Sequence, residues 1–146
     1  MIRIRPYQPS DVHAAAELVG LLGYAASEER MRKRMEAIDS QPTAATFVAE
    51  YGGSVAGMVG LRKLYPYEQD DPVVQIAALV AGSNYRGLGI GRALVLQAER
   101  WAAEAGASAL VLTSGMRPER EEAHRFYAHL GFAVTGKRFV KTVRQP

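Results

Sequence analysis

Three glycines at alternate positions precede an expected helix in the segment Arg86-Gly87-Leu88-Gly89-Ile90-Gly91-Arg92. Glycine lets the backbone curl so that several N–H groups point into one concavity. The first turn of the helix adds its own unpaired N–H groups and a partial positive charge. Arg86 and Arg92, at the two ends, can add charge-assisted hydrogen bonds. The segment therefore predicts a site for a phosphate or pyrophosphate group.

Two common phosphate-binding loops do not fit this segment. A P-loop ends in Gly-Lys followed by Ser or Thr, whereas this loop ends Gly91-Arg92-Ala93. A dinucleotide-binding loop is followed about 20 residues later by an acidic residue that closes a strand. The strand expected here, Ala109-Leu110-Val111-Leu112-Thr113, has none. A helix-starting turn that binds no ligand stays open as the alternative interpretation.

The elements that must position this loop are predicted from apolar periodicity and turn residues. Strands are expected at residues 2–5, 47–50, 55–61, 73–81, 109–112, 132–134 and 139–143. Helices are expected between Ser10 and Gly23, from Ser27 to before Pro42, over 91–105 and from about 119 to 129. The Gly52-Gly53 pair predicts a hairpin. Residues 76–112 predict a right-handed parallel strand–helix–strand crossover inside an otherwise antiparallel sheet.

Length and composition restrict the class of protein. A chain of 146 residues is expected to form one domain, 1–146. It has no run of eighteen apolar residues and no apolar stretch typical of a signal peptide, so we expect no membrane contact and a cytoplasmic protein. Without cysteine there are no disulfides and no thiolate ligands. The net charge of +3 is not gathered on one segment, so no nucleic-acid partner is expected.

A second motif lies near the C-terminus, where residues 123–132 read Ala-His-Arg-Phe-Tyr-Ala-His-Leu-Gly-Phe. This segment resembles the late helix of the GNAT superfamily of N-acetyltransferases, which carries a Tyr and ends in Gly-Phe. Arg86, Gly89 and Gly91 match the family motif Gln/Arg-x-x-Gly-x-Gly/Ala, which follows the fourth strand. The resemblance covers nearly the whole chain. It implies an α/β (α+β) fold: a mixed, mostly antiparallel twisted sheet of about seven strands with four helices, whose parallel fourth and fifth strands splay apart.

The resemblance also implies acetyl-coenzyme A as co-substrate. In the family, the amides of the loop hold the pyrophosphate, and pantetheine pairs with the end of the fourth strand. The implied cofactor-binding residues are Leu79, Val80, Ala81, Arg86, Gly87, Leu88, Gly89, Ile90, Gly91 and Arg92. Ser114 is a secondary contact, since relatives often place Asn near this position just after the fifth strand.

The implied reaction is direct attack of an amine on the thioester in a ternary complex, with Tyr127 as general acid. Tyr127 shares its helix face with apolar residues, so packing is the alternative role. Several branches carry a Glu on the fourth strand, but residues 75–79 contain no carboxylate. A water chain could replace that base. Glu68, Asp70 and Asp71 could instead gather a cationic amine, although a solvated loop is an alternative interpretation.

The expected acceptor is a primary amine of a small molecule. Acetylation of a protein N-terminus or lysine is an alternative, against which the missing Glu counts. A non-catalytic acyl-CoA-binding domain is another, against which Tyr127 counts. The three histidines show no ligand spacing, so no metal is expected, and the resemblance is compatible with a homodimer. Acceptor-pocket walls are expected from the first two helices and the last two strands; candidates in those helices, which could equally be packing residues, are Gly20, Gly23, Tyr24, Met31, Arg34 and Met35.

Overall fold

The computed structural model describes residues 1–114 and 120–143, which belong to two units, 1–112 and 113–146. The first unit holds β1 (Ile2–Pro6), α1 (Val12–Leu21), α2 (Glu28–Asp39), β2 (Ala44–Tyr51), β3 (Ser54–Leu64), β4 (Val73–Ala81), α3 (Ile90–Glu104) and β5 (Leu110–Leu112). The second holds α4 (Glu121–His129). Within the described ranges, none of the helices is long and apolar enough to cross a membrane.

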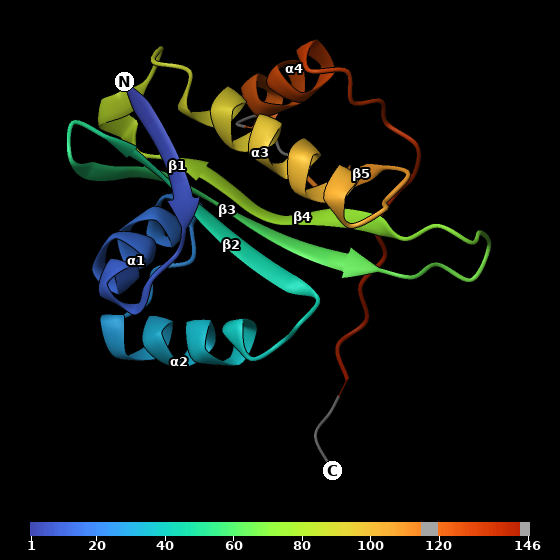
Figure 1. Ribbon diagram of the computed structural model, residues 1–146, viewed down its shortest axis with the longest axis horizontal. Coiled ribbons are helices and arrows are strands. Elements are labelled where there is room, and N and C mark those ends of the chain that lie inside the picture. Colours follow the sequence, from blue (N-terminus) through green and yellow to red (C-terminus); the bar gives the residue numbers. More distant parts are fainter. Residues whose placement is uncertain (115–119, 144–146) are drawn as a thin grey trace. The chain divides into compact units, whose positions relative to one another are not determined.

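The five strands of the first unit form one sheet in the order β1-β2-β3-β4-β5 (Figure 1). Strands β1 to β4 are antiparallel to their neighbours, whereas β4 and β5 are parallel. The parallel pair confirms the strand–helix–strand crossover predicted for 76–112. The hairpin is confirmed as well: Gly52 and Gly53 take φ values of +60° and +82°, which a two-residue turn between β2 and β3 requires.

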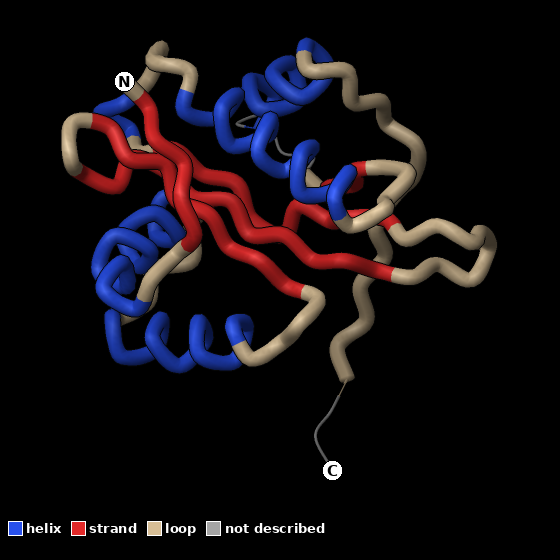
Figure 2. Tube along the Cα trace, viewed as in Figure 1, coloured by secondary structure: helices blue, strands red, loops and turns tan. Residues whose placement is uncertain are grey.

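Helices cover both faces of this sheet, with α1 and α2 on one face and α3 on the other (Figures 1 and 2). Met58 of β3 belongs to the buried cluster that α1 and α2 close. Its neighbour Gly57 faces α3, because successive strand residues point to opposite faces. A Cβ at Gly57 would lie 2.6 Å from Ile90 Cγ2 and 2.9 Å from the carbonyl oxygen of Val80. Only glycine therefore lets α3 pack this close to β3.

Strand β4 contains a bulge that its regular apolar pattern does not reveal. Gly60 of β3 pairs with Ala78, but the next residue, Leu61, pairs with Ile76. Ala77 is therefore an extra residue in β4, and a bulge of this kind bends the strand. Since paired residues share a face, Ile76 lies with Leu61 on the side of α3, whereas Ala78 lies with Gly60 on the side of α1 and α2.

The last part of β4 has an edge that β5 does not pair with. The pairing of β4 with β5 ends at Ile76 and Leu112, although β4 continues to Ala81. The N–H of Gly82 donates to the carbonyl of Ala56 in β3 at 2.7 Å. Hydrogen-bonded positions alternate along an antiparallel strand. The N–H and C=O groups of Leu79 and Ala81 therefore point away from β3, toward the edge left open within residues 1–112.

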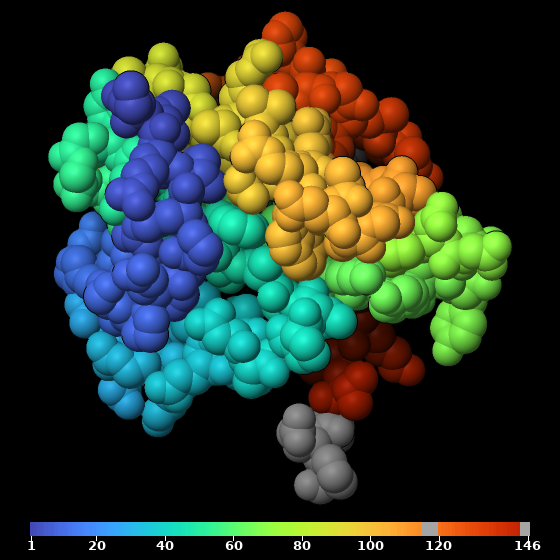
Figure 3. Space-filling view, viewed as in Figure 1, coloured from blue at the N-terminus to red at the C-terminus, as the bar shows by residue number. Residues whose placement is uncertain are grey.

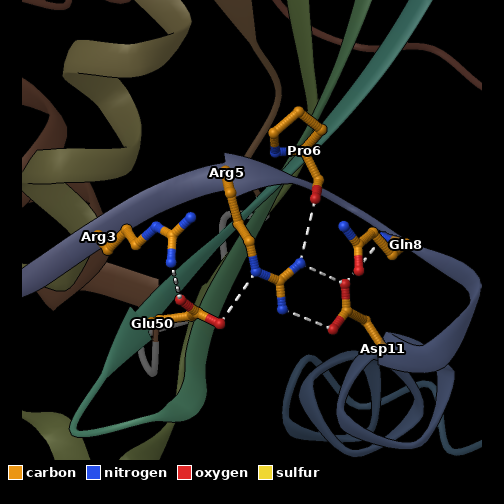
Figure 4. Close-up of polar contacts among 6 residues, drawn as sticks. All are labelled: Arg3, Arg5, Pro6, Gln8, Asp11 and Glu50. Atoms are coloured by element: carbon orange, nitrogen blue, oxygen red, sulfur yellow. Dashed lines mark hydrogen bonds and ion pairs between the residues drawn. The ribbon is translucent and has the colours of Figure 1, made fainter.

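A polar network ties the start of the chain to the sheet (Figure 4). Arg5 of β1 donates from both terminal nitrogens to the carboxylate of Asp11, each at 2.8 Å, and from Nε to Glu50 at 3.0 Å. Asp11 is buried in the turn before α1, and it also accepts the backbone N–H of Gln8 at 2.8 Å. The network therefore fixes the turn by which the chain passes from β1 into α1.

In the second unit, α4 begins and ends close to the prediction, although Glu119 lies outside the described residues. The strands predicted at 132–134 and 139–143 are wrong: residues 132–143 form none, and the sheet has five strands rather than about seven. Val134, Phe139 and Val140 are exposed. β-Branched and aromatic residues of this kind are typical of a strand, but a strand also needs a neighbour for its backbone groups, which no local pattern supplies.

Candidate functional site

The glycine loop and the first turn of α3 expose a set of backbone donors. Gly87 and Gly89 take φ values of +77° and +83°, which favour glycine. Gly89 is the N-cap, and its carbonyl accepts the N–H of Ala93 at 3.0 Å. The N–H groups from Gly89 to Arg92 therefore have no partner inside the helix. The helix begins at Ile90, one residue before the predicted start.

Buried contacts hold this loop in place. Ile90 is only 2% exposed, so the first residue of α3 is anchored in the core against Gly57. Upstream, the Tyr85 ring packs edge-on against Tyr51 with 6.0 Å between the ring centroids. A Cβ at Gly82 would lie 3.0 Å from the Tyr85 ring, so a larger residue there would displace Tyr85. The loop is thus fixed at both ends.

Between these anchors the loop is open to solvent. Residues 86–89 and Arg92 are exposed, and the segment 86–92 contains two arginines and no acidic residue. Backbone N–H groups and guanidinium groups are the donors that bind phosphate oxygens. The donor set of the loop fits a phosphate or pyrophosphate group.

The open edge of β4 leads directly into this loop, because only Gly82 and the short helical turn Ser83–Tyr85 separate Ala81 from Arg86. Leu79 and Ala81 present N–H and C=O groups to that edge. Such groups can pair with the amides of an extended chain, as a neighbouring strand would. The first unit therefore combines a place for an extended amide-containing chain with a place for a phosphate beside it.

In the second unit, Tyr127 lies at the centre of an aromatic cluster. Its ring packs edge-on against Phe126 and Phe132, with centroid distances of 5.7 and 6.0 Å. Burial raises the pKa of the Tyr127 phenol above its ordinary value, although Arg120 favours the phenolate and opposes the shift. The phenol is protonated at neutral pH, so it can donate a proton.

Arg120 is a residue of this region that the sequence interpretation missed. Its Nη2 donates to the hydroxyl of Ser114 at 3.5 Å, and the same guanidinium acts on the Tyr127 phenol. The predicted secondary contact Ser114 therefore has an arginine neighbour within its own unit. No spacing rule indicates this, because Arg120 immediately precedes α4 while Ser114 follows β5.

The carboxylates proposed to gather an amine lie at the wrong end of β4 for that role. Glu68, Asp70 and Asp71 are exposed in the β3–β4 connection, which projects from the rest of its unit (Figure 3). This connection precedes Val73, and the strand from Val73 to Leu79 spans roughly 20 Å at about 3.3 Å per residue. A side chain is too short to cover that distance. The geometry supports the alternative of a solvated loop.

Three of the expected acceptor-pocket residues, Met31, Arg34 and Met35, line one cavity of about 240 Å³, which we call the α2 cavity. Gly20, Gly23 and Tyr24 do not line it. Arg62 of β3 does, and the sequence interpretation missed it. It follows Gly60 by two residues and Met58 by four, and this spacing could have indicated a position facing α2. Among the described residues, no group of three His, Asp or Glu side chains could hold a metal ion.

The chain resembles known proteins in its sequence and in its fold. The model of the Acetyltransferase (GNAT) family matches residues 12–132. N-acetyltransferase 8 of Mus musculus is 34% identical over 94 residues, which cover 64% of this chain and 40% of that protein. Aminoalkylphosphonate N-acetyltransferase of Salmonella typhimurium is 33% identical over 91 residues, which cover 62% of this chain and 58% of that protein. The matched segments thus span only about half the length of these curated relatives.

A solved structure supports the fold. AAC(6')-Iy, in complex with the bisubstrate analogue CoA-S-monomethyl-acetylneamine, superposes with a TM-score of 0.83 at 20% identity. The superposition covers 99% of each chain. At this identity the similarity establishes the mixed α/β architecture with its parallel β4–β5 pair.

Proposed function

The chain belongs to the GNAT family of acetyltransferases, and we propose that it transfers the acetyl group of acetyl-coenzyme A to a primary amine of a small molecule. The observation that carries the proposal is the open edge of β4 at Leu79 and Ala81, followed at once by the glycine loop. An extended amide chain that ends in a pyrophosphate, as coenzyme A does, fits that order of groups. The solved relative bound to a coenzyme A analogue supports the same ligand.

We assign the contacts with the coenzyme as follows. The N–H groups from Gly87 to Gly91 would bind the pyrophosphate oxygens, with Arg86 and Arg92 adding charge. Leu79 and Ala81 would pair with the amides of pantetheine. The N–H and C=O groups of Val80 point toward β3, so Val80 would only hold its two neighbours in place. Ser114 stays a secondary contact. The coenzyme supplies the acetyl group as an activated thioester.

Tyr127 is the proposed general acid. During transfer a C–N bond forms, the C–S bond breaks, and the sulfur leaves as a thiolate that needs a proton. Because burial raises the pKa of the Tyr127 phenol, the phenol is neutral and can supply that proton. The position of Tyr127 beside the sulfur is part of the proposal.

The amine must lose a proton before it attacks. An alkyl amine with a pKa of about 10.4 is only about one part in 10³ neutral at pH 7, so deprotonation costs roughly 4–5 kcal/mol. Residues 75–79 carry no carboxylate, and the acidic β3–β4 connection is too far away. We therefore propose that water carries this proton to solvent.

A thiol-release assay with acetyl-coenzyme A and a panel of amines tests the proposal. Tyr127→Phe is expected to lower kcat by about 10²- to 10³-fold and to leave the KM for acetyl-coenzyme A unchanged. Tyr67→Phe, at a fully exposed tyrosine, is the control. Unchanged turnover in Tyr127→Phe would remove Tyr127 from the mechanism. Binding of acetyl-coenzyme A without thiol release from any amine or peptide would favour an acyl-CoA-binding domain.

The glycine loop is tested with a matched pair of variants. Gly89 directly precedes α3 and Gly106 follows its C-cap residue, both have positive φ, and neither is crowded around its Cβ position. Gly89→Ala and Gly106→Ala should each cost about 1–2 kcal/mol of stability. Only Gly89→Ala should also raise the KM for acetyl-coenzyme A. Equal KM values in the two variants would contradict the proposed role of the loop.

A further inference from the structure

The α2 cavity lies within the first unit, between α2 and the sheet face that α1 and α2 cover. Met31 and Met35 of α2 and Met58 of β3 form an apolar part of its wall. All three methionines are buried. Methionine side chains are unbranched and adapt to the shape of a guest. The wall is suited to the carbon skeleton of a small molecule.

Small residues make the sheet side of this cavity hollow. Thr46, Gly60 and Ala78 lie opposite one another on β2, β3 and β4 and share the face toward α2. The nearest atoms to a Cβ built on Gly60 would be 3.8 Å away, in Ala78. The bulge residue Ala77 adds a fourth small residue to this side of the lining. The hollow thus reaches β4 at its bulge, directly before the open edge at Leu79.

Two arginines give the cavity its charge. Arg34 of α2 and Arg62 of β3 both line it, and no acidic residue does. Among the described residues, neither guanidinium has an ion-pair or hydrogen-bond partner, whereas the nearby Arg32 pairs with Glu29 at 3.6 Å. Thr46, 9% exposed, adds a hydroxyl to the same lining. Unpaired guanidinium groups beside an apolar wall favour a guest with a carboxylate, phosphate or phosphonate.

The α2 cavity lies next to the edge of β4 at which we place the coenzyme. Along β4, Ala78 is the last residue of the lining and Leu79 is the first residue of the proposed coenzyme edge. One strand residue spans only about 3.3 Å. A guest in the cavity can therefore place its amine at the bulge while its other end lies toward α2, where Arg34 lies.

We propose that the acceptor is a small amine that also carries an anionic group, with Arg34 and Arg62 binding that group in the α2 cavity. This inference rests on the proposed acetyl transfer. The protonated amine loses one proton to water, and its nitrogen then bonds to the acetyl carbon while the C–S bond breaks. The departing thiolate takes a proton from the Tyr127 phenol, and the nitrogen gives up its second proton, which restores the phenol. The anionic group takes no part in the bond changes. Arg34 and Arg62 are positioning residues that set the orientation of the acceptor.

The size and charge of the cavity restrict the acceptor further. Its volume of about 240 Å³ lies below the roughly 300–1,000 Å³ of pockets for drug-sized ligands. An acceptor of the size of an amino acid or an aminophosphonate fits these limits. Polyamines and aminoglycosides carry several positive charges, which the two arginines repel.

Thiol release with four matched amines tests the proposal. β-Alanine and aminoethylphosphonate carry an amine and an anionic group, β-alaninamide replaces the carboxylate by a neutral amide, and putrescine carries a second amine. We expect kcat/KM for at least one anionic amine to exceed that for β-alaninamide and putrescine by about 10- to 100-fold. A preference for carboxylate or for phosphonate identifies which anion the arginines bind. Equal or higher activity with putrescine would overturn the proposal and leave the acetyl transfer intact.

Variants of the two arginines separate orientation from folding. Arg34→Gln and Arg62→Gln should each raise the KM for the anionic amine about 10-fold or more and leave the KM for acetyl-coenzyme A unchanged. Arg34→Lys should restore part of the affinity. Arg30→Gln, at an exposed arginine of the same helix that does not line the cavity, is the control. If Arg30→Gln has the same effect, general charge on α2 rather than the cavity is responsible, and the proposal is wrong.

Calorimetric titration of both anionic amines into the protein, without acetyl-coenzyme A, measures the anion site without turnover. Binding of one of them that is lost in the Arg34→Gln, Arg62→Gln double variant would support the site even if the transfer reaction failed. No binding of either, together with no preference in the thiol assay, would overturn it.

Discussion

Gly57 of β3 is the position where one added methyl group should disturb the site most directly. Its Cβ would lie 2.6 Å from Ile90 Cγ2, 2.9 Å from the Val80 carbonyl oxygen and 3.0 Å from Leu94 Cδ1. A backbone oxygen cannot rotate away, so α3 must move relative to β3. Overpacking of a closely packed core costs about 1–3 kcal/mol. We expect Gly57→Ala to lose that much stability.

Gly60→Ala is the matched control, since Gly60 lies on the same strand and also has an ordinary φ. Its Cβ would meet only Ala78, at 3.8 Å. Replacing glycine by alanine reduces the freedom of the unfolded chain and contributes about 0.4–1 kcal/mol in both variants. The difference between the two variants therefore measures the clash alone.

Urea unfolding provides the assay. With a slope of about 2 kcal/mol per molar urea, the midpoint of Gly57→Ala should lie roughly 0.5–1.5 M below that of Gly60→Ala, and Gly60→Ala should leave the midpoint of the wild type unchanged or raise it slightly. Because Ile90 is the first residue of α3, the same shift should raise the KM for acetyl-coenzyme A in Gly57→Ala. Equal midpoints in the two variants would refute the reasoning that α3 packs against a bare backbone at Gly57.

Two further predictions concern pH. Hydrogen bonds from Arg5, and secondarily from the N–H of Gln8, lower the pKa of Asp11. The Arg5–Asp11 pair therefore stabilises the fold fully at pH values above the ordinary pKa of 3.8, and this contribution is lost as pH falls through the lowered pKa. Asp11→Asn should cost about 3 kcal/mol at pH 7 by urea unfolding, and its gap to the wild type should close in acid. Glu28, and secondarily Glu17, raise the pKa of His13. The protonated His13 therefore stabilises the fold fully at pH values below 6.5, and this contribution disappears as pH rises through the raised pKa. His13→Gln should therefore be less stable than the wild type near pH 6 and equal to it in alkaline buffer, and a constant gap would contradict that ion pair.

Much of the first unit could be predicted from local patterns. The limits of β4 at Val73 and Ala81 were predicted correctly, as was the hairpin at Gly52 and Gly53. Ser27 caps α2 as expected, since its hydroxyl accepts the N–H of Arg30 at 3.2 Å. These features depend on residues close in the sequence, whose preferences act before any tertiary contact forms.

The features that depend on distant partners were missed or wrong. The strands predicted after Gly131 are absent from the described residues, because pairing needs a neighbour that the pattern does not specify. The spacing of Arg62 from Gly60 could have placed it on the sheet face toward α2. Its lack of an ion-pair or hydrogen-bond partner among the described residues depends on how three strands and a helix pack together. The bulge at Ala77 is also invisible in the sequence, since Ala-Ala fits a regular strand equally well. The assignments of Tyr127 and of the coenzyme contacts stay predictions.

The bulge in β4 also determines how the strand tolerates changes in its length. Val74 and Ile76 are buried on the side of α3, and Val80 is buried on the side of α1 and α2, although all three have even numbers. Ile76 and Ala78 already lie on opposite faces, so deleting Ala77 would restore strict alternation and leave every later side chain of β4, and the edge groups of Leu79 and Ala81, in their present directions. Only the bend that the extra residue gives the strand would be lost. The register of the site on β4 should therefore survive the deletion of this one residue, which a regular strand would not allow.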